Sequence, residues 1–178
     1  MRRERHLPSR RALLLLGILS AVACSGPPAD QTFVPAVPTM DGFPAVSDAL
    51  EMHCGTLDCH GSLARNLRIY GIDGLRFDKG LAPGSDNTTP EEQTLTYEAL
   101  IAIQPEVLGQ IVIERGARPE RWLVITKGRG TEHHKGGSRM RLGDDTDHCI
   151  TSWLTGVVAV DACGRAAVDV SPPGGPGF

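Results

Sequence analysis

The stretch from His53 to Gly61, with the sequence HCGTLDCHG, constrains this chain more than any other segment. Two cysteines, Cys54 and Cys59, lie five positions apart, and His60 follows the second cysteine directly. Two thiols and an imidazole in so short a stretch indicate either a site that binds a metal or a prosthetic group, or a disulfide crosslink. The rest of the chain has to decide between these two interpretations.

A cysteine pair that ends in Cys-His is the attachment motif of c-type haem, normally with two residues between the cysteines. Each thiol adds to one haem vinyl group, and the following histidine, here His60, binds the iron as the proximal ligand. The spacer in this chain has four residues, and both thiols still reach the macrocycle if the spacer loops out. The alternatives are a Cys54–Cys59 disulfide with His60 as a polar neighbour and, in a cytosolic protein, a zinc site.

The N-terminal segment predicts export. Residues 1–23 contain five arginines and then an apolar run that is too short to span a bilayer, as in a signal peptide. The run ends in Ala21-Val22-Ala23-Cys24, and small residues before a cysteine resemble the lipobox of bacterial lipoproteins. We therefore predict lipidation of Cys24 and a lipid-anchored location at the cell envelope, on the outer membrane or the periplasmic face. The alternative is an ordinary signal peptide cut near Ala23, which leaves Cys24 free.

The charge and length of the mature chain limit its partners and its architecture. Residues 24–178 carry 13 Lys and Arg against 20 Asp and Glu, a net charge of −7. This balance argues against nucleic acid and anionic lipid as partners. The 155 residues suit one domain with tails. Neither a Gly-x-Ser-x-Gly motif nor a P-loop is present, so the sequence does not indicate hydrolysis or phosphate chemistry.

Local patterns predict a helical domain between two less regular ends. Residues 24–43 are Pro-rich and predict an extended tether, 44–163 form the domain, and 164–178 are expected to be a flexible tail. Helical periodicity predicts a helix over 44–53 that runs into the cysteine pair. Further helices are expected over 90–104, with Thr89 and Glu92 as a capping box, 105–114, 119–127 and 146–154, with a loop over 131–143 before the last.

This order of elements resembles the small cytochrome c domains of exported bacterial proteins, particularly the planctomycete-type cytochrome c group. The resemblance covers residues 44–160. It rests on the cysteine motif, the Gly-Leu-rich stretch 71–77, the His-x-Gly-Gly at 134–137 and a last helix that ends in Trp153-Leu154. It implies a mainly α, cytochrome c-like domain with long loops. It also implies that Cys54 and Cys59 attach haem c and that the protein exchanges electrons with a redox partner protein.

The resemblance further implies a distal iron ligand from the loop before the last helix. Met140 has the matching position, although the usual Met-Pro pair is absent, and His133 and His134 are the rival ligands. Met/His ligation gives a higher reduction potential than ligation by two histidines. The remaining haem contacts are expected from the apolar walls Leu67 and Trp153 and from a propionate partner, Arg65 or Arg68.

Cys149 and Cys163 form a second cysteine pair. In an oxidising compartment they are expected to form a disulfide that closes a 15-residue loop, worth about 3 kcal/mol in the chain-entropy model. A zinc site shared with Cys54 or Cys59 is the functional rival. The alternative to a haem protein is a non-catalytic lipoprotein domain, held by the two disulfides Cys54–Cys59 and Cys149–Cys163 and lacking haem.

Overall fold

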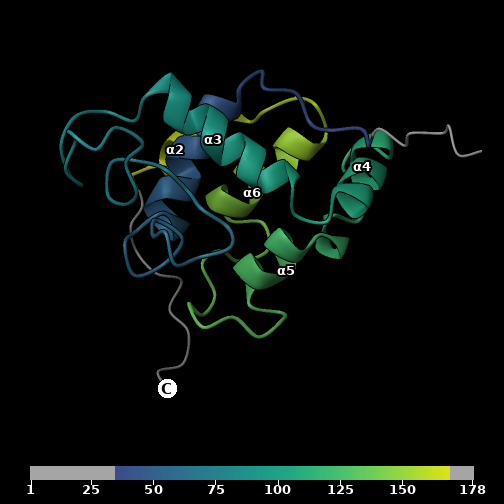
Figure 1. Cartoon of the computed structure of the whole chain (residues 1–178). Coiled ribbons are helices and arrows are strands. Elements are labelled where there is room, and N and C mark those ends of the chain that lie inside the picture. Colours follow the sequence, from purple (N-terminus) through teal and green to yellow (C-terminus); the bar gives the residue numbers. More distant parts are fainter. Residues whose placement is uncertain (1–34, 169–178) are drawn as a thin grey trace, which may run out of the picture. The chain divides into compact units, whose positions relative to one another are not determined.

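The computed structural model describes residues 35–168, and this part of the chain is helical, without a β-strand (Figure 1). The mainly α class is confirmed for these residues, whereas the likeness to cytochrome c stays a prediction. None of the described helices is long and apolar enough to cross a membrane. The predicted signal peptide and Cys24 lie outside the described residues. The helices are α2 (Phe43–Cys54), α3 (Pro90–Ile101), α4 (Pro105–Ile113), η2 (Pro119–Arg121), α5 (Leu123–Arg129), α6 (Asp145–Leu154) and α7 (Val160–Ala166).

The predicted capping box is present at the start of α3. The Thr89 side chain accepts a hydrogen bond from the Glu92 backbone N–H at 3.2 Å, and the Thr89 N–H donates to the Glu92 carboxylate at 3.0 Å. At α6, Asp144 is the N-cap and accepts from the Asp147 N–H at 2.8 Å. The capping box could be predicted from the sequence because the side chains and the backbone groups that they cap lie within three residues.

The helix expected over 119–127 is two elements instead of one. Trp122 separates η2 from α5 because its backbone is extended, with φ −85° and ψ 130°. Its indole N–H donates to the carbonyl oxygen of Ile103 at 2.8 Å, and the side chain is fully buried. This tertiary anchor overrides the local helical pattern, and α5 then ends at Gly130, which has a left-handed φ of 70°.

The core forms where α2 packs against α3, α6 and α7, and Figure 1 shows α2, α3 and α6 close together. An aromatic cluster fills its centre. The ring of Phe43 lies 5.0 Å from that of Trp153 and 5.3 Å from that of Tyr97, and Trp122 lies 6.5 Å from Trp153. The structure therefore places Trp153, expected to be a haem wall, among aromatic side chains of the core.

The last residues of the predicted tether are attached to the domain. The hydroxyl of Tyr97 donates to the carbonyl oxygen of Pro38 at 2.7 Å, and the indole of Trp153 donates to that of Thr39 at 2.8 Å. A Pro-rich stretch lacks regular internal hydrogen bonds, so it presents free carbonyl oxygens to such donors. Residues 35–42 thus lead directly into α2 along the surface of the domain.

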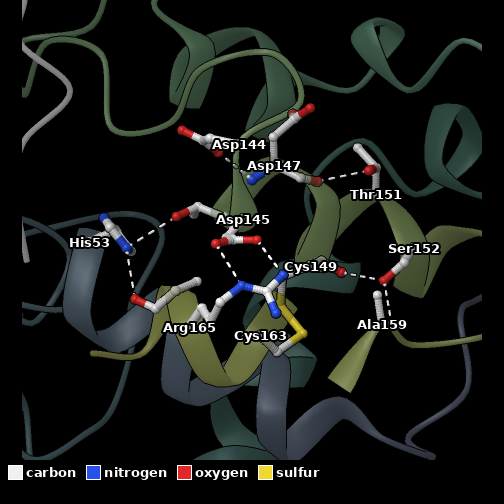
Figure 2. The surroundings of a disulfide bond; sticks show 12 residues. His53, Asp144, Asp145, Asp147, Cys149, Thr151, Ser152, Ala159, Cys163 and Arg165 are labelled. Carbon is white, nitrogen blue, oxygen red and sulfur yellow. Dashed lines mark hydrogen bonds and ion pairs between the residues drawn. A yellow bond between two sulfur atoms is a disulfide. The ribbon is translucent and has the colours of Figure 1, made fainter. Parts of the chain in front are cut away.

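The Cys149–Cys163 disulfide is confirmed, and Figure 2 shows it joining α6 to α7, with a Cα–Cα distance of 4.7 Å. Both cysteines are fully buried. Helix α7 continues beyond Cys163 to Ala166, which is buried, so residues 164–166 of the segment expected to be a tail are helical. A seven-residue helix has little stability of its own, so the crosslink and the packing of Ala166 hold it in place.

The long connection between α2 and α3 is tied down by two buried carboxylates. Arg76 forms a bidentate ion pair with Glu92 at 2.9 and 3.1 Å and binds the carbonyl oxygens of Ser85 and Asn87. Glu51, on α2, accepts hydrogen bonds from the Thr88 hydroxyl at 2.6 Å and from the Ile72 N–H at 3.4 Å. Burial raises the pKa of Glu51 to about 7. These contacts hold the connection against the helix that carries Cys54.

Candidate functional site

A mainly apolar cavity of about 400 Å³ lies at the C-terminal end of α2. Its walls come from α2, from the chain after the cysteine pair, from the end of α3 and from α5. This size suits a small prosthetic group rather than a single ion. The lining residues are Leu50, Cys54, His60, Arg65, Asn66, Leu67, Ile69, Leu100, Ile103, Leu123, Val124, Lys127, Gly128 and His134.

A more polar hollow of about 500 Å³ adjoins this cavity. Both spaces are lined by His60, Arg65, Lys127 and His134. The hollow is completed by Asp58, Cys59, His133, Lys135, Gly136 and Arg139. The two thiols therefore border different spaces, because Cys54 lines the apolar cavity and Cys59 lines the polar hollow, with the two histidines at the boundary.

The four-residue spacer folds into a compact turn. The N–H groups of Cys59 and Gly61 both donate to the carbonyl oxygen of Thr56, at 2.9 and 3.0 Å. The His60 N–H donates to the carbonyl oxygen of Cys54 at 2.8 Å. The spacer thus loops out, and His60 returns to the end of α2 in spite of the extra residues.

Cys54 and Cys59 are free thiols, so the Cys54–Cys59 disulfide of the alternative interpretation is not formed. Both side chains are partly buried. Burial raises the pKa of the Cys54 thiol to about 12, against an opposing effect of the Arg139 charge. Arg139 also approaches the other thiol, with its Nη2 4.0 Å from the sulfur of Cys59. Neither sulfur is therefore engaged in a disulfide, and each lines one of the two spaces.

The imidazole ring of His60 lines the cavity and is fixed by a hydrogen bond. Its Nδ1 lies 3.0 Å from the carbonyl oxygen of Leu67. A carbonyl oxygen can only accept, so Nδ1 carries the proton and the lone pair remains on Nε2. Burial lowers the pKa of His60, and the nearby His134 and Arg65 act in the same direction, which favours the neutral imidazole. Metal-binding histidines are commonly oriented by such a hydrogen bond.

The ring of His134 is fixed in a similar way. Its Nδ1 lies 3.1 Å from the carbonyl oxygen of Gly137, and this carbonyl can only accept. The two imidazole rings are stacked, with centres 5.9 Å apart and planes inclined by 15°. Both rings border the cavity and the polar hollow.

The other two candidate ligands are placed differently. Met140 is 2 % exposed and packs in the core against α5, where a Cβ at Gly128 would lie 3.3 Å from its sulfur. His133 is exposed, and its carbonyl oxygen accepts a hydrogen bond from Lys127 at 2.6 Å. The sequence order favoured Met140, but the histidine whose ring lies beside His60 is His134.

Sequence reasoning missed the part of the site that comes from distant segments. Leu67 was expected at the cavity and Arg65 near it, and both line it. The cations Lys127 and Arg139 had no local signal, because isolated basic residues in a sequence usually indicate a solvated surface. The apolar walls Leu100, Ile103, Leu123 and Val124 were readable as buried helix faces but not as a common lining.

No group of three or more His, Cys, Asp or Glu side chains is placed to hold a metal ion within residues 35–168. Comparison with known proteins adds no further constraint: no family model, no curated protein and no solved structure matches the chain. The function therefore has to be argued from the two histidines, the two thiols and the cavity that they border.

Proposed function

We propose that this protein is an electron carrier of the cell envelope that binds one haem c through Cys54, Cys59 and His60. The observation that carries the proposal is the pair of imidazoles of His60 and His134, which lie nearly parallel across the boundary of the two spaces, with ring centres 5.9 Å apart. A porphyrin supplies four ligands to its iron, so the protein has to supply two more.

The residues present fit such a group in three respects. The cavity is lined mainly by aliphatic side chains, which suit the face and edge of a porphyrin. Two unbridged thiols border the adjoining spaces. Each imidazole has its Nδ1 hydrogen-bonded to a carbonyl oxygen, so in the neutral ring the lone pair lies on Nε2. A disulfide-held domain without a cofactor would require none of these features.

We propose His134 rather than Met140 as the second axial ligand. Both belong to the loop before α6, but Met140 packs in the core while His134 lines the cavity. Ligation by two histidines gives a lower reduction potential than Met/His ligation. The protein is therefore expected to work at the low end of the c-type range.

The remaining residues of the site bind, orient and shield. Leu67 contributes a wall with its side chain and fixes the ring of His60 with its carbonyl oxygen. Arg65 is held by the carbonyl oxygens of Asp58 and Cys59, at 2.7 and 3.0 Å, and lines both spaces, which suits a partner for a propionate. The haem, when bound, supplies one-electron chemistry. The aliphatic walls limit the access of water to it.

We also propose that the protein is exported and lipid-anchored through Cys24, on the basis of the N-terminal sequence. Replacement of Cys24 by Ser is expected to release the protein from the membrane fraction or to leave it unprocessed. Fractionation and electrophoretic migration of the variant measure this effect. Unchanged fractionation and migration would show that Cys24 is not lipidated.

The decisive experiment is the absorption spectrum of the reduced, denatured protein after export from cells that contain a c-type maturation system. Covalent haem is retained after denaturation, and C54A/C59A is expected to abolish its retention. A variant with Thr56 and Leu57 deleted, which restores a two-residue spacer, controls for a maturation system that rejects the long spacer. If neither chain retains haem and the purified protein does not bind added haem, the proposal is wrong.

The second ligand is tested by three single variants of the haem-loaded protein. H134A is expected to change the low-spin spectrum and to raise the reduction potential, whereas H133A and M140L leave both unchanged. M140L removes the sulfur but keeps the volume of a buried side chain. If M140L instead changes the spectrum while H134A does not, Met140 is the ligand.

A further inference from the structure

The rim of the polar hollow is basic, although the protein as a whole is acidic. Four of its lining residues are cationic, Arg65, Lys127, Lys135 and Arg139, and we name them the basic collar. One lining carboxylate, Asp58, opposes them. Residues 24–178 have a net charge of −7. The local charge at this hollow is therefore opposite in sign to the net charge of the chain.

Most of the positive charge of the basic collar is not neutralised within the described residues. The guanidinium of Arg65 is hydrogen-bonded to backbone carbonyl oxygens, which orient it without cancelling its charge. Lys135 is exposed and forms no ion pair with another described residue. Lys127 is the exception, because it pairs with Glu132 at 2.8 Å.

Arg139 is the most unusual member of the basic collar. Its Nε is buried and has no hydrogen-bond partner within the described part of the chain. Leaving a buried donor unsatisfied costs free energy, so it demands an explanation. Its Nη2 lies beside the sulfur of Cys59, at 4.0 Å, which is a weak acceptor. No described carboxylate pairs with Arg139, so its charge adds to the positive potential at the hollow.

Two exposed leucines accompany the basic collar. Leu57 is 55 % exposed in the spacer turn, next to Asp58 of the rim. Leu63 is 67 % exposed, two residues before Arg65. An apolar contact area with charged residues around it is the composition of a protein interface. The long spacer therefore does more than separate the thiols, because it adds an exposed leucine directly before Asp58, which lines the hollow.

We propose that the basic collar, together with Leu57 and Leu63, is the docking surface for an acidic patch on a redox partner protein. The proposal rests on the proposed haem function and adds the place and the chemistry of electron exchange. Complementary charge raises the encounter rate and orients the partner towards the hollow that His60 and His134 share. An anionic membrane is the weaker match, because an extended surface also meets the acidic remainder of the chain.

The first test measures the sign of the salt dependence of electron transfer. The reduced haem-loaded protein is mixed with hexacyanoferrate(III), which accepts one electron and becomes hexacyanoferrate(II), while no proton or bond is transferred. A collar that governs the encounter predicts that the rate falls as salt is added, by about tenfold between low and high ionic strength. If the negative net charge of the protein governed the encounter instead, the rate would rise as salt is added. A cationic oxidant, tris(phenanthroline)cobalt(III), should show a rate that rises with salt.

Two charge-reversal variants form a matched pair for this test. K135E alters the basic collar, and K79E makes the same change in net charge elsewhere. Lys79 follows Arg76 and Phe77, which bond to Glu92 at the start of α3, whereas the cavity is lined by Leu100 and Ile103 from the other end of that helix. K135E is expected to abolish most of the salt dependence, and K79E to change the rates less than about twofold.

A second readout does not depend on electron transfer. Amide resonances of ¹⁵N-labelled mature protein carrying C24S are followed while a decaglutamate peptide is added, with and without salt. Shifts are expected at Lys127, Lys135 and Arg139 but not at Lys79, and K135E should remove them. Sedimentation with phosphatidylglycerol vesicles tests the membrane as an alternative, and binding to vesicles without binding to the peptide would overturn the proposal.

The outcomes separate the two proposals. If haem is neither retained nor bound when added, the proposed function fails, whereas the peptide titration still reports on the docking surface. If haem is retained but the rate with hexacyanoferrate(III) rises with salt and the peptide shifts no collar resonance, the docking surface is refuted and the electron carrier remains. Equal effects of K135E and K79E would likewise refute the docking surface. They would show that the net charge of the protein, and not the position of the basic collar, controls the rate.

Discussion

The two cysteine pairs of this protein have opposite fates. Cys149 and Cys163 are separated by 14 positions, yet they are bridged and fully buried. Cys54 and Cys59 are separated by five positions, yet they are free and border two different spaces. Nearness in sequence therefore does not decide which thiols pair. The packing of α6 against α7 closes one pair, and the spacer turn that starts at Thr56 holds the other open.

This contrast divides the molecule into a crosslinked end and an adaptable end. At the crosslinked end the disulfide restricts the unfolded chain and holds the short helix α7. At the other end two thiols remain free, and a cavity and an unsatisfied guanidinium nitrogen cost stability unless a ligand compensates for them. Cysteine thus stabilises the fold at one end, where it is bridged, and is proposed to bind a ligand at the other end, where it is free.

The largest effect is expected from removal of the crosslink. C149A/C163A should lower the free energy of unfolding by about 3 kcal/mol, because the unfolded chain loses its constraint. C54A/C59A should change the stability of the haem-free protein by less than about 1 kcal/mol, because its thiols are neither bridged nor in the centre of the core. Urea unfolding followed by circular dichroism measures both values. Equal losses in the two double variants would contradict the division into two ends.

Glu51 is expected to make the cysteine-pair end sensitive to pH. Its pKa is raised to about 7 in the folded protein, against about 4.3 in an unfolded chain. The folded state therefore binds the proton more tightly, so this contribution to stability is complete below about pH 4.3 and is lost as the pH rises through 7. The protein should lose about 2 kcal/mol between pH 5 and 8 for this reason.

The variant E51Q tests this assignment. Glutamine keeps the shape of the side chain and has no buried charge, so E51Q should be more stable than the parent above pH 7 and should show a flatter pH profile. Thermal unfolding at a series of pH values measures the difference. A parent protein whose stability rises steadily over the same range, with E51Q following in parallel, would show that Glu51 does not titrate there.

Variants of Met140 and His134 are expected to distinguish a side chain that packs in the core from one that serves as a ligand. M140L should cost about 1 kcal/mol of stability, because it exchanges one buried side chain for another of similar volume. H134A should cost less, because this residue is partly exposed on a loop. Denaturant unfolding of the haem-free variants measures these effects. A large loss in H134A without haem would indicate that His134 serves the fold instead of a ligand.

The smallest effect is expected in the spacer turn. L57S should change the stability by less than about 0.5 kcal/mol, because the Leu57 side chain is exposed and packs against no core residue. The same variant should weaken binding of the partner if Leu57 belongs to the docking surface. Thermal unfolding provides the first measurement and the decaglutamate titration a control, since the peptide contacts charge and not leucine.

Several features could be predicted from the sequence because their causes are local. The capping box of Thr89 and Glu92 involves backbone groups within three residues, and α2 follows from its apolar spacing. The Cys149–Cys163 pairing was expected from the small number of thiols and from the oxidising compartment that the N-terminal segment predicts. His60 was a candidate because it directly follows Cys59, and it lines the cavity.

The tertiary structure decided what depends on distant segments. Trp122 breaks a helix because its indole finds a carbonyl oxygen on another element, and α7 exists because a disulfide holds it. The side chain whose ring lies beside that of His60 belongs to His134 and not to Met140. The basic collar combines residues from three separate stretches of the chain. Periodicity and caps describe energies within one segment, whereas a cavity and a ligand pair are set by the packing of several.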